Sequence, residues 1–175
     1  MNVVRLTVPF RSENLPVICS SHLAGSGSGP ISVPKSGEDR FVLASPRKVL
    51  IADDDALVRK AVARGLRNAL GLKEEETLLA DNIESACQVF QENQKAVRAV
   101  MTDICMPEDG AGLRLYDFIR ERSSEIPIAM MSGGMNDASQ KRLDQILQND
   151  SRSRFVEKPI SNIREVAAWF NSFWQ

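Results

Sequence analysis

The feature of this sequence that most restricts its fold is an alternation of two patterns along residues 48–175. Short apolar runs of strand length alternate with segments in which apolar residues recur every three or four positions. The first run, residues 49–52, leads into a segment over 58–70 whose apolar residues share one helical face. Strands that alternate with helices are typical of a parallel sheet covered by helices. We therefore predict an α/β domain over residues 46–175.

Four further strand–helix pairs follow. The expected strands span residues 77–80, 97–102, 126–131 and 154–157, and the helices after them have apolar faces within 83–90, 115–119, 143–147 and 163–174. The fourth helix, expected over 138–148, has the thinnest apolar stripe, formed by Leu143, Ile146 and Leu147. The last helix opens with Asn162 and Glu165 in the spacing of a capping box. Five such units use this part of the chain, so we expect no second folded domain.

Residues 1–45 show neither pattern. They hold four of the eight prolines and a glycine-serine run over residues 25–30. Their few apolar residues cannot offset the entropy that ordering such a segment would cost. We predict a disordered N-terminal extension.

Charge and cysteine content exclude several classes of function. The formal net charge is −1, so no broad positive field favours nucleic acid or an anionic membrane. No window approaches the roughly 18 apolar residues of a membrane span. Cys19, Cys87 and Cys105 form neither a paired-thiol motif nor a zinc pattern with His22. We expect a cytoplasmic protein that contacts neither nucleic acid nor membrane directly.

Polar side chains that could form a site follow the first, third, fourth and fifth expected strands. Residues 53–55 are three aspartates after the first strand, and Asp103 follows the third. Ser132 follows the fourth strand and Lys158 the fifth. Each residue alone has a structural explanation, such as capping of the next helix by an aspartate. Parallel strands end at one edge of a sheet, where ligands bind, so the set together predicts one site.

The chemistry of such a set points to a metal ion and a phosphoryl group. Clustered carboxylates repel one another unless a cation neutralises them. Magnesium prefers oxygen ligands, whereas zinc would require His or Cys ligands that these strand ends lack. A carboxylate can also act as a nucleophile toward phosphorus when a metal and a lysine neutralise the transferring group.

Four segments carry a resemblance to a known family: KVLIADDDALVR, VMTDICMP, IPIAMMSGG and FVEKPI. They occur in the order and spacing of a response-regulator receiver domain, which residues 48–175 resemble as a whole. The resemblance implies a flavodoxin-like doubly wound fold, a five-stranded parallel sheet of order 2-1-3-4-5 with helices on both faces. The strand order comes from the family and not from the sequence pattern.

The same resemblance assigns roles to the residues at the strand ends. It implies that Asp103 accepts a phosphoryl group. Magnesium would be held by Asp54 and Asp103 directly, by Asp53 through a water, and by the backbone carbonyl of Cys105. Asp55 has no family role and is expected to cap the first helix.

The resemblance also implies a conformational switch. Ser132 and Lys158 would contact the phosphoryl oxygens, and Phe155 matches the family's switch aromatic. Phosphorylation would then change a surface formed by the fourth helix, the fifth strand and the fifth helix. The expected function is that of a stand-alone signalling domain and not a classical enzyme.

Partners follow from the same family. The donor would be a sensor histidine kinase or a histidine phosphotransfer protein, and the signal would pass to a downstream protein. The resemblance does not decide whether the protein forms a homodimer.

The resemblance also bears on the lifetime of the phosphoryl group. In the family, polar side chains at the positions of Cys105 and Gly134 orient a hydrolytic water. Because neither residue offers one, we expect slow autodephosphorylation. The stretch over 108–112 is about one residue longer than the family pattern.

One alternative is a phosphatase of the haloacid-dehalogenase type. Asp53 and Asp55 form the Asp-any-Asp pair of that family after an apolar strand. The family also needs an acidic pair well after the lysine, where this sequence has only Glu165.

A second alternative is a receiver-like module that binds its partner without phosphorylation. In that case Trp169 and Phe173 on the last helix would form an aromatic contact surface. The complete set of site residues argues for a phosphorylated domain instead.

Overall fold

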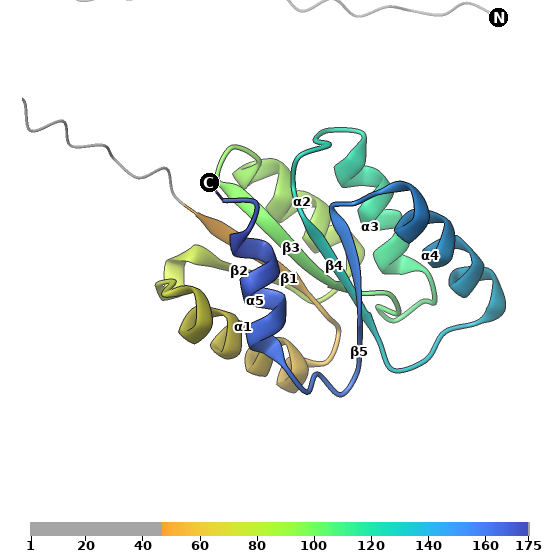
Figure 1. Cartoon of the computed structure of the whole chain (residues 1–175), viewed down its shortest axis with the longest axis horizontal. Coiled ribbons are helices and arrows are strands. Elements are labelled where there is room, and N and C mark those ends of the chain that lie inside the picture. The colour runs from red at the N-terminus through yellow and green to blue at the C-terminus, as the bar shows by residue number, and fades with distance from the viewer. Residues whose placement is uncertain (1–46, 175) are drawn as a thin grey trace, which may run out of the picture. The chain divides into compact units, whose positions relative to one another are not determined.

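One parallel sheet organises the part of the chain that the computed structural model describes, residues 47–174. Its strands are β1 (Lys48–Ala52), β2 (Thr77–Ala80), β3 (Val97–Asp103), β4 (Ile128–Ser132) and β5 (Ser153–Glu157). They pair in the order β2-β1-β3-β4-β5, all parallel, so the predicted flavodoxin-like order is confirmed (Figure 1). The extension predicted to be disordered, with Cys19 and His22, lies outside the described residues.

Helices cover both faces of this sheet (Figure 1). They are α1 (Ala56–Leu70), α2 (Ile83–Asn93), α3 (Ala111–Arg120), α4 (Asp137–Asn149) and α5 (Ile163–Asn171), with a short 3-10 helix at Glu74–Glu76. Val49 on β1 packs with Leu66 and Phe170 under α1 and α5. Its neighbour Leu50 packs with Phe90 on the opposite face, under α2, α3 and α4. Successive strand residues point to opposite faces, so a strand buried on both faces is apolar throughout.

Local hydrogen bonds set the helix ends. The Asp55 carboxylate accepts the backbone N–H of Leu57 at 2.7 Å, and Gly71 caps the C-terminal end of α1 with a φ of 68°, which suits glycine. At the start of α5, Asn162 accepts the backbone N–H of Glu165 at 3.4 Å. The return bond comes from the Asn162 amide to the Glu165 carboxylate, so half of the predicted capping box forms.

Two expectations about the fourth unit differ from the structure. β4 begins at Ile128 and not at residue 126, and it extends to Ser132. Pro127 lies before it and has no N–H with which to join the sheet ladder. Leu147, expected inside, is 37% exposed, because α4 turns only a narrow face toward the sheet. Among the described residues, no helix has the length and apolar content needed to cross a bilayer.

A cluster of paired polar groups closes the end of the sheet where the strands begin. The Asp150 carboxylate accepts hydrogen bonds from Tyr116 at 3.0 Å, Arg120 at 2.7 Å and Ser153 at 2.7 Å. The backbone N–H of Arg152 adds a fourth at 2.9 Å. Arg120 and Asp150 are only 15% and 17% exposed. This cluster joins the ends of α3 and α4 to the start of β5.

Candidate phosphoacceptor and metal site

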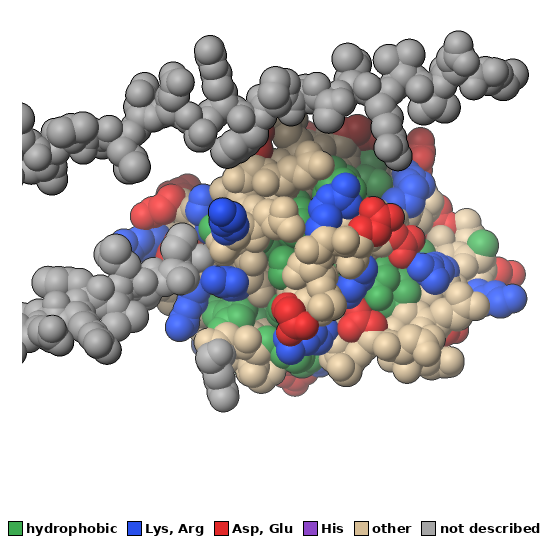
Figure 2. Space-filling view, turned by 90° about the horizontal axis from the view of Figure 1, so that it is seen from above, with side chains coloured by type: hydrophobic (Ala, Val, Ile, Leu, Met, Phe, Trp, Pro, Cys, Tyr) green, Lys and Arg blue, Asp and Glu red, His purple; other side chains and the backbone are tan. Residues whose placement is uncertain are grey.

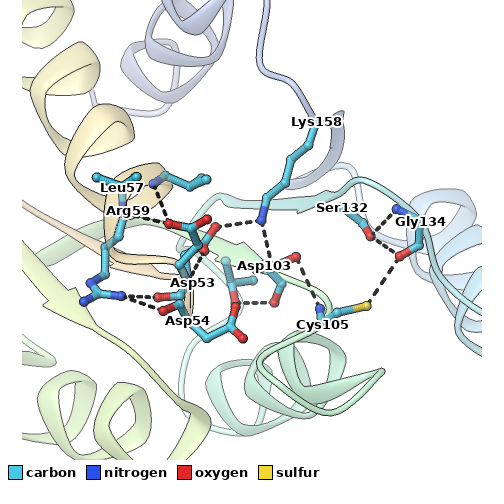
Figure 3. Close-up of polar contacts among 12 residues, drawn as sticks. Asp53, Asp54, Leu57, Arg59, Asp103, Cys105, Ser132, Gly134 and Lys158 are labelled. Carbon is cyan, nitrogen blue, oxygen red and sulfur yellow. Dashed lines mark hydrogen bonds and ion pairs between the residues drawn. The ribbon is translucent and has the colours of Figure 1, made fainter.

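Four of the predicted strand-end residues gather at the edge where the strands end (Figure 3). Asp53 and Asp54 follow β1, Asp103 ends β3 and Lys158 follows β5. The Lys158 ammonium group lies 2.7 Å from a carboxylate oxygen of Asp53 and 2.7 Å from one of Asp103. Asp53 and Asp103, which precede the lysine by 105 and 55 positions in the sequence, thus bind the same cation.

Three carboxylates cluster here, and two of them, Asp53 and Asp103, pair with the Lys158 ammonium group. Oxygens of Asp53, Asp54 and Asp103 all lie within 4.8 Å of one another. Asp53 is fully buried and Asp103 is 6% exposed. The second oxygen of Asp53 accepts the backbone N–H of Asp55 at 2.9 Å, and that of Asp103 accepts the N–H of Cys105 at 3.3 Å. Within the described residues the exposed Asp54 carboxylate accepts no hydrogen bond, so its oxygens are open to a ligand.

Burial and the contacts with Lys158 shift the pKa values of the buried groups. Burial raises the pKa of Asp53, and the hydrogen bond from Lys158 opposes that rise only in part. Burial alone would lower the pKa of Lys158, but its bonds to Asp103 and Asp53 outweigh burial and raise it. Lys158 is therefore charged at neutral pH, and a further cation would favour the charged form of Asp53.

The residues at this edge fit a hard divalent cation. All three clustered side chains offer oxygen, the ligand that magnesium prefers. The Cys105 carbonyl accepts no hydrogen bond from residues 47–174 and so is also available. The Cys105 thiol instead contacts Asp109 at 3.2 Å and the Gly134 carbonyl at 3.5 Å. Burial and the contact with Asp109 raise the pKa of this thiol, so it is neutral and unsuited to metal binding.

Among the described residues, Ser132 forms no hydrogen bond to these carboxylates, and Phe155 lies on β5. The Ser132 hydroxyl donates to the Gly134 carbonyl at 2.6 Å and accepts the Gly134 N–H at 3.1 Å, so it is engaged within its own loop. Its carbonyl accepts the backbone N–H of Lys158 at 2.9 Å. Phe155 is half-buried on β5, opposite Met130 in the strand register.

Gly112 is a residue of this site that the sequence did not reveal. A Cβ atom at this position would lie 2.0 Å from the carbonyl oxygen of Asp103, which no real contact permits. The Gly112 N–H also donates to the Ile104 carbonyl at 3.0 Å. Only glycine lets the first turn of α3 lie against the backbone that carries Asp103. No local pattern signals this approach, because the two residues belong to different elements.

Two further side chains hold the loops of the site in place. Arg59 on α1 donates to the backbone carbonyls of Asp53 and Asp54. Asp109 accepts the backbone N–H of Asn136 at 3.3 Å and so joins the loop after β3 to the start of α4. Neither residue stands out in the sequence, since their partners are loop backbone atoms.

The site also bears on the phosphatase alternative. The Asp55 side chain accepts the N–H groups of Leu57 and Val58 at the start of α1, and it does not join the cluster of Asp53 and Asp103. The Asp-any-Asp pair on which that alternative depends is therefore not formed. As expected, Asp55 is a helix cap.

Comparisons with known proteins agree with the fold. The family model of the response regulator receiver domain matches residues 49–168. A two-component response regulator-like protein, PRR37 of Oryza sativa subsp. indica, is 29% identical over 128 residues, which are 65% of this chain and 16% of that protein. This chain therefore spans only a small part of its curated relative.

Two solved structures are similar as well. The receiver domain of the hybrid histidine kinase CckA is 26% identical, with a TM-score of 0.55 over 74% of this chain and 99% of that one. A response regulator receiver protein from Pseudomonas putida is 25% identical, with a TM-score of 0.58 over 74% of this chain and 98% of that one. The family model matches most of the chain, and the sheet has the flavodoxin-like strand order. This protein therefore belongs to the response-regulator receiver family of two-component signalling.

Proposed function

We propose that Asp103 accepts a phosphoryl group from a phosphohistidine of a sensor kinase or a phosphotransfer protein. The observation that carries this proposal is a nearly buried carboxylate bound to Lys158 at 2.7 Å and adjacent to two further carboxylates. One Asp103 oxygen would attack the phosphorus, the phosphorus–nitrogen bond would break, and the histidine nitrogen would leave with its electron pair and take up a proton. Lys158 would then pair with an oxygen of the transferred group.

Magnesium would be held by Asp54, Asp103 and the Cys105 carbonyl, with Asp53 contributing through a water. A bound magnesium ion supplies positive charge that offsets the charge on the transferring group. The excess of carboxylates over cations at this edge supports this assignment. Asp53 and Lys158 would orient the site, because each is fixed by hydrogen bonds that do not involve the metal.

The signal would leave through the surface of α4, β5 and α5. Ser132 would exchange its bonds to Gly134 for one to the phosphoryl group, and Phe155 would change its packing as the hydroxyl moves. Receiver domains work with histidine kinases and with protein partners, so the domain would signal by binding and not by turnover of a substrate.

Intact-mass spectrometry tests the proposal. The protein is incubated with magnesium and acetyl phosphate, and we expect one added phosphoryl group in the wild type and in Asp55→Asn, but none in Asp103→Asn. A wild type that gains no phosphoryl group, or an Asp103→Asn variant that labels equally, contradicts it. Removal of the donor should then reveal slow loss of the label, and loss within a minute at neutral pH would overturn the expectation of slow autodephosphorylation.

A further inference from the structure

A groove of about 1010 Å³ lies at the end of the sheet where the strands begin, away from the carboxylate cluster. The loops after α2 and α3 and the residues after α5 line it. Figure 2 is a view onto this end of the molecule. It shows Lys and Arg side chains beside hydrophobic ones, with acidic side chains among them. Its volume is at the upper end of the range for ligand pockets, so it has room for several side chains of a partner.

The charge of this groove is opposite to that of the phosphoacceptor edge. Its lining contains five cationic residues and one acidic residue: Arg47, Lys95, Arg98, Arg122, Arg152 and Glu125. The chain as a whole has a formal net charge of −1. The excess of four positive charges is therefore a local feature, and it does not reflect a basic protein.

Several of these cations have no acidic partner. Arg152 pairs with Glu125 at 2.9 Å, and Arg122 pairs with Glu121 at 3.1 Å, outside the groove lining. In residues 47–174, Arg47, Lys95 and Arg98 form no ion pair, and the side chains of Lys95 and Arg98 are exposed. These three cationic groups can therefore pair with carboxylates of a partner without breaking an ion pair within residues 47–174.

Aromatic side chains line the same groove and are held in place. Arg152 lies over the ring of Phe173 at 5.0 Å, and Arg47 lies over that of Trp174 at 5.9 Å. The Trp174 indole N–H donates to the Arg98 carbonyl at 3.0 Å. Both aromatic residues are only half-buried, so their rings offer apolar contact area.

The wall behind the groove is also fixed. Arg120, bound to Asp150, donates from its guanidinium to the carbonyls of Ser123 at 3.3 Å and Ile126 at 2.8 Å. Both carbonyls belong to residues that line the groove. A surface that is already ordered loses little entropy when a partner binds, which favours binding.

We propose that this groove binds an acidic peptide segment of a partner protein, with apolar side chains between its carboxylates. Unpaired cations beside half-buried aromatic rings match such a segment in both charge and apolar contact. Nucleic acid fits less well, because it carries a charge about every 1.7 Å and needs a long basic track, whereas the positive excess is confined to one groove. This binding does not depend on phosphorylation of Asp103.

Fluorescence anisotropy with the full chain tests the proposal. The probe is a short labelled peptide in which glutamate alternates with leucine, and a matched peptide has glutamine in place of glutamate. The double variant Lys95→Glu, Arg98→Glu should weaken binding of the acidic probe by roughly tenfold or more. Lys60→Glu, Arg64→Glu changes the charge equally on the exposed side of α1 and should alter binding by less than about twofold.

Three results would overturn the proposal: equal weakening by both double variants, equal binding of the glutamine peptide, or tighter binding of a single-stranded oligonucleotide of the same charge. Acetyl phosphate labelling provides a check on folding. Both double variants should label at Asp103 as the wild type does, so a failure of this groove and a failure of the phosphoacceptor site are told apart.

Discussion

The two ends of the sheet treat their acidic side chains in opposite ways. Where the strands begin, the Asp150 carboxylate accepts four hydrogen bonds, one of them from Arg120. Where the strands end, Asp53 and Asp103 pair with Lys158, and the nearby Asp54 carboxylate has no cationic partner among the described residues. The first arrangement pairs the Asp150 charge within the chain, whereas the second leaves negative charge to be neutralised from outside. The Asp150 cluster is therefore structural, whereas the Asp53, Asp54 and Asp103 cluster is suited to bind a cation.

The largest expected effect concerns the end where the strands begin. Asp150→Ala should lower the free energy of unfolding by about 3 kcal/mol, because it leaves the nearly buried Arg120 without its acidic partner. Asp144→Ala, on the exposed side of α4, the helix that Asp150 follows, should change it by less than about 0.5 kcal/mol. Chemical denaturation measures both values. An equal effect of the two variants would show that the Asp150 cluster is not structural.

Metal binding should affect only the end where the strands end. At a magnesium concentration a hundredfold above its Kd, the ion should raise the free energy of unfolding by about 2.7 kcal/mol. Asp54→Asn should remove most of this gain, since Asp54 is the carboxylate with open oxygens, whereas Asp150→Asn should leave it unchanged. Thermal unfolding with and without magnesium measures the gain. Its persistence in Asp54→Asn would contradict the proposed ligand set.

The close approach at Asp103 provides a test of the site's geometry. Gly112→Ala should lower the free energy of unfolding by about 2 kcal/mol and slow phosphoryl labelling, because the new methyl group meets the Asp103 carbonyl. Gly134→Ala is the matched control, since a Cβ there meets nothing within 4 Å. It should cost less than about 0.5 kcal/mol. Unimpaired labelling in Gly112→Ala would show that this contact does not position the acceptor.

The smallest expected effect concerns pH. The contributions of the two ends of the sheet to the free energy of unfolding should change in opposite directions on acidification. Burial would raise the pKa of Asp150, but hydrogen bonds from Ser153, Arg120 and Arg152 outweigh it and hold the pKa below the ordinary 3.8. The stability that Asp150 contributes is therefore complete above pH 3.8 and is lost as the pH falls through its lower folded value. Asp53 has a raised pKa, so its protonation on acidification favours the folded state.

The free energy of unfolding, measured over a pH series without metal, separates the contribution of Asp150 from that of Asp53. Asp150→Asn should flatten the loss of stability at acid pH, because the group that titrates is gone. Asp53→Asn should steepen that loss, because the compensating gain disappears. Identical pH profiles for both variants and the wild type would contradict the assignment of the two shifts.

The site residues at the strand ends could be predicted from the sequence. The contacts between backbone segments that are distant in the sequence could not. Asp53, Asp103 and Lys158 could be grouped because each follows an apolar run, and parallel strands end at one edge. The approach of Gly112 to Asp103 and the hydrogen bonds of Asp150 could not, since both depend on how α3 and α4 lie against the sheet. The start of β4 was misplaced because apolarity alone does not record the missing N–H of Pro127.

Mapping the modified residue tests the central claim most directly. After labelling with acetyl phosphate and magnesium, borohydride reduction converts an aspartyl phosphate to homoserine, which peptide mass spectrometry locates. We predict conversion at Asp103 alone, dependent on magnesium and reduced in Asp54→Asn. Conversion at Asp53 or Asp54 instead, or no conversion at any aspartate, would contradict a phosphoacceptor at the end of β3.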